Sequence, residues 1–216
     1  MVRASLTKTC FGSRRCGYCE DSVADEVEHI KPKDLYPELA FVWKNYLYAC
    51  GPCNGPKNNQ FAVLSHRSGT LVEVSRRHGQ PIVPPERGDP VLIDPRTENP
   101  LDYLQLDLLG TFLFLPAGTV GSREFCRASY TIRVLRLNDR DYLLAARREA
   151  FLSYRARLVE YVAKKESGIS GTKLNRLVTA LRSMGHPTVW HEIKRQHSLI
   201  PELNALFDKA PEAVHW

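Results

Sequence analysis

Four of the six cysteines form two matched pairs, and each pair has the spacing of a metal-binding turn. CGYC contains Cys16 and Cys19, and CGPC contains Cys50 and Cys53. Two intervening residues let both thiolates of a pair reach one ion, as in tetrahedral Zn²⁺ sites. A redox pair is the main alternative, but it does not account for two matched pairs. We therefore predict one structural Zn²⁺ held by four cysteines.

The two pairs are separated by 30 residues, which is longer than the usual zinc-ribbon spacing, so this segment must contain folded structure. It includes EVEHIKPK (residues 26–33), whose apolar and acidic alternation predicts a β-strand that ends at His29. NYLYA predicts a second strand, and CNGPKNNQF the start of a helix. The expected order is strand, loop, strand and helix around the zinc. From its residue type alone, His29 is a charged surface residue, a zinc ligand or a general base.

This arrangement resembles the HNH endonucleases, within the ββα-metal group of nucleases. The resemblance covers about residues 16–61 and lies in the Glu28-His29 pair, Asn45 and Asn54, framed by the four cysteines. It implies metal-dependent hydrolysis of phosphodiester bonds that leaves 5′-phosphate and 3′-hydroxyl ends.

The resemblance also implies a role for each of these residues. Four cysteines complete a zinc site, so His29 is free to act as the general base, because an imidazole titrates near neutral pH. A second ion, Mg²⁺ or another hard divalent cation, prefers oxygen ligands such as Glu28 and the side-chain carbonyl of Asn54. Family members often have Asp or His in place of Glu28. The remaining predicted site residues are Asn58 as a further ligand, Asn45 as the residue that bonds the loop and orients His29, and Lys57, Lys31 and Lys33 as nucleic-acid contacts. In the simpler interpretation, the lysines are solvated charges and Asn54 caps a helix.

A wider resemblance extends over about residues 16–151. CGYCE, VEHIKPK, VLIDPRTENPLDYLQLD and RASYTIRVLRLNDRDYLLAARREAF are similar to the PtuB-type HNH proteins of Septu antiviral defence in bacteria. That resemblance implies a partner, an SMC- or ABC-like ATPase of the PtuA type, which would restrain the nuclease.

The other predicted strands and helices follow from hydrophobic periodicity and from capping and turn residues. DYLQLDLLGTFLFLP alternates on both sides of Gly110 and predicts a β-hairpin, and PVLID (residues 90–94) predicts a short strand. Ser122 is a candidate N-cap for a helix to about Leu137, whose expected apolar stripe is Phe125, Ile132 and Leu135. Further helices are expected over about residues 140–165, 172–184, 188–196 and 201–207.

Composition limits the class of protein. The 216 residues are 43% hydrophobic and 25% charged, as is usual for globular proteins. No stretch approaches the ~20 apolar residues of a membrane helix, and the N-terminus lacks the apolar core of a signal peptide. We therefore expect a cytoplasmic bacterial protein with no membrane partner. Residues 123–195 contain 16 Lys and Arg against 7 Asp and Glu, which favours either a polyanionic partner or a solubilising surface.

Together these observations predict an α+β protein. The expected regions are an HNH module with structural zinc at residues 1–64, a connecting region with a β-hairpin at 65–121, and a basic helical region for partner docking at 122–216. The predicted activity is endonucleolytic cleavage of nucleic acid, with DNA favoured over RNA as substrate, in antiviral defence. The alternatives are an RNA-cleaving, tRNA-type toxin and a non-catalytic zinc module that binds nucleic acid or a partner.

Overall fold

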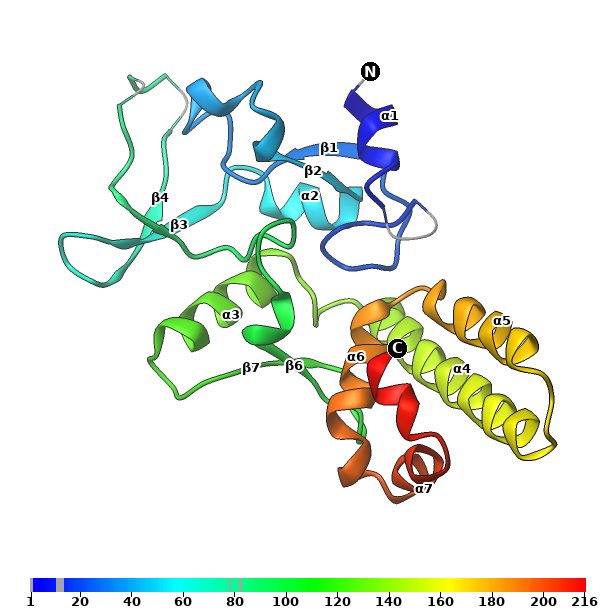
Figure 1. Cartoon of the computed structure of the whole chain (residues 1–216). Coiled ribbons are helices and arrows are strands. Elements are labelled where there is room, and N and C mark those ends of the chain that lie inside the picture. The colour runs from blue at the N-terminus through cyan, green and yellow to red at the C-terminus, as the bar shows by residue number, and fades with distance from the viewer. Residues whose placement is uncertain (1, 11–13, 78, 82) are drawn as a thin grey trace. The chain divides into compact units, whose positions relative to one another are not determined.

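The computed structural model describes residues 2–10, 14–77, 79–81 and 83–216, and this part of the chain contains seven α-helices and seven short strands (Figure 1). The α+β class and the mostly helical C-terminal half are confirmed. The chain divides into two compact units. Unit 1 contains the N-terminal residues to Cys10, Arg14–Gln105 and Phe114–Arg140, and unit 2 is formed mainly by Leu106–Leu113 and Asp141–Trp216. The functional boundaries at residues 64 and 121 stay a prediction.

A β-hairpin of β1 (Glu26–His29) and β2 (Tyr46–Ala49) lies at the centre of the cysteine-rich segment. The strands are antiparallel, and His29 pairs with Tyr46. Successive side chains of a strand point to opposite faces. On one face, Tyr46 and Tyr48 pack with Leu6 of α1 (Val2–Thr7). The other face meets α2 (Gly51–Lys57), so a helix contacts each face of the hairpin (Figure 1).

A second sheet in unit 1 has the order β4-β3-β5, formed by Leu71–Val74, Phe61–Ser65 and Gly88–Pro90. A Cβ atom on Gly88 would lie 2.3 Å from the carbonyl oxygen of Leu64, so only glycine allows this close strand approach. The strand predicted over residues 90–94 is present only at its start, because β5 ends at Pro90 and the Val91 amide makes the last bond to β3, to the carbonyl of Ala62 at 3.0 Å. Beyond it, the amide of Ile93 donates to Thr131 Oγ1, 3.1 Å away on a helix, instead of to a strand.

The predicted hairpin around Gly110 is confirmed as the sheet of β6 (Leu104–Leu106) and β7 (Phe114–Pro116). Ser122 caps α3 (Arg123–Val134) as predicted, accepting a bond from the Phe125 amide at 3.1 Å. The predicted apolar stripe is confirmed only at Leu135, which is 1% exposed just after the helix ends, whereas Phe125 and Ile132 are half-buried. The buried residues within α3 are Arg127, Ala128, Tyr130, Thr131 and Val134. Arg127 is buried because its guanidinium pairs with Glu98.

Unit 2 contains α4 (Asp141–Glu166), α5 (Gly171–Arg182), α6 (Pro187–Gln196) and α7 (Pro201–Lys209), close to the predicted ranges. Its core is aromatic. Trp190 stacks on the rings of Tyr154, Phe207 and Trp216, with centroids 5.4 to 6.3 Å apart. The buried Glu192 side chain of α6 accepts a hydrogen bond from the Leu106 amide at 3.2 Å, which holds Leu106 to α6. Among the described residues, no helix is both long and apolar enough to cross a bilayer.

Candidate metal centre and neighbouring polar site

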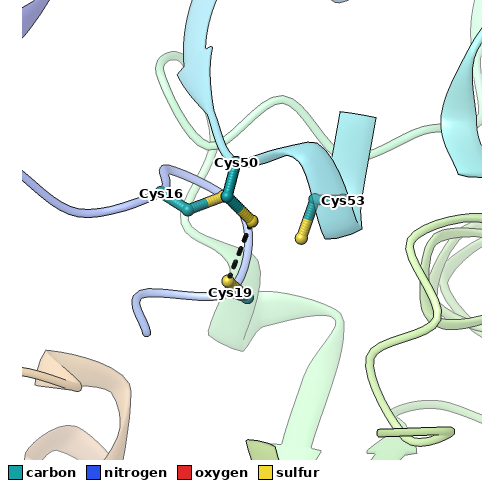
Figure 2. A group of neighbouring side chains, drawn as sticks. All are labelled: Cys16, Cys19, Cys50 and Cys53. Atoms are coloured by element: carbon teal, nitrogen blue, oxygen red, sulfur yellow. Dashed lines mark hydrogen bonds between the residues drawn. The ribbon is translucent and has the colours of Figure 1, made fainter. Parts of the chain in front are cut away.

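The sulfur atoms of Cys16, Cys19, Cys50 and Cys53 all lie within 4.8 Å of one another (Figure 2). Tetrahedral bonds of about 2.3 Å from zinc would place sulfur atoms about 3.8 Å apart. The sulfurs of Cys19 and Cys50 are 3.8 Å apart, and all four residues are at most 4% exposed. The predicted cluster is therefore present, and its donors and spacing are compatible with a structural zinc.

Local structure explains how the two pairs meet. Cys50 follows β2 directly and precedes the first turn of α2, which contains Cys53 (Figure 2). The first pair is held beside the hairpin because the amide of Gly17 donates to the carbonyl of Tyr48, 2.9 Å away. A Cβ atom on Gly17 would lie only 2.8 Å from the Leu47 side chain, so glycine permits this contact.

The four thiols bond one another and do not titrate alike. Hydrogen bonds within the cluster lower the pKa of Cys19 and Cys50 and raise the pKa of Cys16 and Cys53. Arg140 Nη2 lies 3.4 Å from Cys53 Sγ and places a positive charge on the cluster. Arg140 was missed in the sequence, because it is 87 residues from Cys53 and no motif joins them.

The imidazole of His29 is half-buried at the end of β1. Its Nε2 lies 2.9 Å from the carbonyl oxygen of Ala40. A carbonyl oxygen only accepts, so Nε2 carries the proton, and Nδ1 has the free lone pair when the ring is neutral. The ring of Tyr46 packs edge-on with centroids 5.1 Å apart, and its hydroxyl donates to the same Ala40 oxygen at 2.8 Å. The His29 ring is thus held in one orientation.

Asn45 is 6% exposed and connects the two ends of the loop between the strands. Its Oδ1 accepts from the amide of Lys31 at 2.8 Å, and its Nδ2 donates to the carbonyls of Lys31 and Leu39 at 2.9 and 3.2 Å. Leu39 precedes Ala40, the residue that binds His29. Asn45 therefore bonds the backbone of the loop, and its predicted role in orienting His29 stays a prediction.

Glu28 and Lys57 form a buried ion pair, with side chains 5% and 0% exposed. Lys57 Nζ also donates to the carbonyl of His29 at 2.9 Å. Burial raises the pKa of Glu28 and lowers that of Lys57, and the opposite charge of each partner counteracts both shifts. Lys57 therefore joins α2 to β1 from inside the protein, and its ammonium does not reach a nucleic-acid strand in this conformation.

Asn54 contacts a carboxylate other than the predicted one. Its Nδ2 donates to Glu26 Oε2 at 2.6 Å, while Glu28 is held by Lys57. Glu26 was missed, although it lies two residues before Glu28 and therefore on the same strand face. Asn58 ends α2 with a φ of 38°, which asparagine tolerates better than most residues. It does not continue the helix face of Asn54.

The predicted site residues are divided between the two faces of the hairpin. Glu26 and Glu28 contact α2, whereas the imidazole of His29 packs with Tyr46 on the opposite face. Among the described contacts, the His29 imidazole bonds neither Glu28 nor Asn54, and the grouping of these three residues around one reaction centre stays a prediction. Of the two loop lysines, Lys31 lies 5.4 Å from the Tyr36 ring centroid and Lys33 is exposed.

Comparison with known proteins gives one local match. The chain is 46% identical over 52 residues to Septu protein PtuB from Bacillus thuringiensis. The aligned segment is 22% of this chain and spans about a fifth of the length of that relative (20%). No family model matches the chain, and no solved structure matches it.

Proposed function

We propose that this chain is an HNH endonuclease that hydrolyses phosphodiester bonds of nucleic acid, as the effector of a bacterial antiviral defence system. The observation that carries the proposal is the fixed His29 imidazole at the end of a strand–loop–strand–helix segment closed by four cysteines. The local similarity to Septu protein PtuB supports the defence role. An SMC- or ABC-like ATPase of the PtuA type is the proposed partner, docked on the basic helical region.

The chemistry assigned to His29 follows from its tautomer. The Ala40 carbonyl holds the Nε2 proton, so Nδ1 is the atom that takes a proton from the attacking water. Asn45 holds the loop backbone through its bond to Leu39, and Tyr46 packs against the His29 ring and limits its rotation. A base that is already oriented pays little entropy when the phosphate arrives.

A hard divalent cation remains part of the proposal, since such an ion stabilises the charge that develops on the scissile phosphate. The predicted ligand set of Glu28, Asn54 and Asn58 does not fit this ion in the present conformation, because the Glu28 carboxylate is buried against Lys57. Glu26 is the carboxylate that contacts Asn54. Metal dependence is therefore tested directly, with Mg²⁺ and other divalent ions.

A second candidate is a zinc module that binds nucleic acid or a partner without catalysis. The Glu28–Lys57 ion pair favours this candidate, because a carboxylate paired with a buried lysine has a structural role that does not depend on catalysis. An RNA-cleaving toxin is a variant of the first proposal that differs in substrate.

The deciding experiment is a cleavage assay with DNA and RNA, with and without the co-expressed neighbouring ATPase. We expect cleavage that requires a divalent cation and falls at least a hundredfold in His29→Ala. His66→Ala is the matched control, since His66 is an exposed histidine of the same unit. Cleavage by His29→Ala at the wild-type rate would refute the assigned base, and nucleic-acid binding without cleavage by any preparation would favour the zinc module.

A further inference from the structure

Unit 1 contains a cleft of about 390 Å³ beside the His29 loop. Its walls come from residues 30–45, from residues 89–98 and from the start of α3. This volume suits a single small organic group, within the range of ordinary ligand pockets. No role was assigned to it from the sequence.

The walls of the cleft are held in place by specific contacts. Arg96 Nη1 donates to the carbonyl of Trp43 at 2.9 Å and so ties the second wall to the first. Arg127 donates to both carboxylate oxygens of Glu98, at 2.5 and 2.8 Å, and ties the second wall to α3. A cleft fixed in this way loses little freedom when a ligand binds.

Some of the basic side chains in the cleft are paired with carboxylates and others are not. Arg127 is neutralised by Glu98, and Arg123 lies 2.8 Å from Asp89. Lys44 is exposed and forms no ion pair among the described residues, and Lys31 contacts only an aromatic ring through its side chain. These two ammonium groups can therefore bind an anion. The apolar residues of the lining are Ile30, Leu39, Val42, Pro90 and Leu92, of which Leu39, Val42 and Pro90 are at least partly exposed.

An anion joined to a flat, partly apolar group is the chemistry of a nucleotide. We propose that this cleft binds one unpaired nucleotide of the nucleic-acid strand, with its phosphate against Lys31 and Lys44 and its base on Leu39 and Val42. Half-buried Asp94 lies in the same cleft and can accept a hydrogen bond from a base amino group. The inference rests on the proposed function and adds a subsite to it.

The position of the cleft agrees with this ligand. Lys31 follows His29 by two residues, and Asn45 both lines the cleft and bonds the backbone of Lys31. A nucleotide in the cleft would thus be held by the loop that fixes the His29 ring. The subsite selects the nucleotide next to the cut, by its unpaired state and by its base.

Binding is tested in the His29→Ala protein, so that substrate survives, by fluorescence anisotropy with single-stranded DNA and RNA oligonucleotides. Val42→Trp fills the cleft and should weaken binding about tenfold, as expected when one base is excluded from the cleft. Lys44→Gln should weaken it about threefold. The matched controls are Val120→Trp and Lys8→Gln, both exposed residues of unit 1 away from the cleft, and they should bind like the parent.

Two further binding measurements distinguish the nucleotide subsite from general binding of nucleic acid. Free nucleoside monophosphate should compete weakly, and a fully paired duplex should be insensitive to Val42→Trp. If both cleft variants bind single strands like their controls, the subsite is refuted, even if wild-type protein cleaves nucleic acid. If the cleft variants lose binding but His29→Ala cleaves like wild type, the subsite stands and the proposed catalytic function falls.

Discussion

Lys57 of α2 and Glu28 of β1 are paired in the interior of unit 1, where the lysine side chain is 0% exposed. Two opposite charges removed from water gain little unless each is fully bonded, and the lysine gains a second acceptor in the His29 carbonyl. The pair therefore fixes the helix that contains Cys53 and Asn54 against the strand that ends at His29.

Removing one member of this pair should be costly. Lys57→Met leaves the Glu28 carboxylate buried without its partner, and we expect a loss of about 3–5 kcal/mol in the free energy of unfolding. Urea denaturation with zinc present measures it, and Lys33→Met on the exposed loop is the control. The double variant Lys57→Met/Glu28→Gln should recover part of the loss. A single variant as stable as wild type would contradict the structural role.

The cysteine cluster predicts one zinc per chain. Cys53→Ser replaces a soft thiolate with a hydroxyl, so zinc content and the unfolding temperature should both fall sharply. Elemental analysis and thermal scans are the measurements. Cys126→Ser, outside the cluster, should retain zinc. Equal zinc content in the two variants would show that the cluster is not the site.

Arg140 should slow the loss of that zinc. Its guanidinium donates to Cys53 Sγ at 3.4 Å, so it opposes the excess negative charge of a four-thiolate centre. We expect Arg140→Gln to release zinc to a colorimetric chelator about tenfold faster, with Arg140→Lys intermediate. Exposed Arg133→Gln is the control. Identical release rates for Arg140→Gln and wild type would remove Arg140 from the metal site.

The Arg127–Glu98 pair predicts a dependence of stability on pH. Burial opposes ionisation of Glu98, but the bonds from Arg127 outweigh it and lower the pKa of the carboxyl below 4.5. The stabilisation is therefore complete above about pH 4.5 and is lost as the pH falls through the lower, folded-state value. After allowance for solvent exposure, Glu98→Gln should cost about 1–2 kcal/mol at pH 7. Denaturation at pH 7 and pH 3 tests this, and a pH-independent difference would contradict it.

Local signals predicted the cysteine cluster, the hairpin and the helices of unit 2. A two-residue spacing, a period-2 alternation or a Ser122 cap depends on neighbours in the chain, so it is visible in the sequence. The burial of Lys57 could not be predicted in this way. A lysine is expected on the surface, and only its tertiary pairing with Glu28 explains why it is buried. Arg127 is likewise a charged residue that is buried, in its ion pair with Glu98. The two faces of β1 follow from strand geometry, but the contact between Glu26 and Asn54 depends on how α2 packs.

The contact between Arg140 and Cys53 has a consequence for the order in which the protein is made. All four cysteines have been synthesised by residue 53, whereas the guanidinium that bonds Cys53 arrives 87 residues later. At ribosomal rates of about 5–20 residues per second, the nascent chain therefore exposes a complete thiolate cage for at least several seconds before Arg140 can bond it. A zinc ion can therefore reach the four cysteines before the bond from Arg140 to Cys53 is able to form.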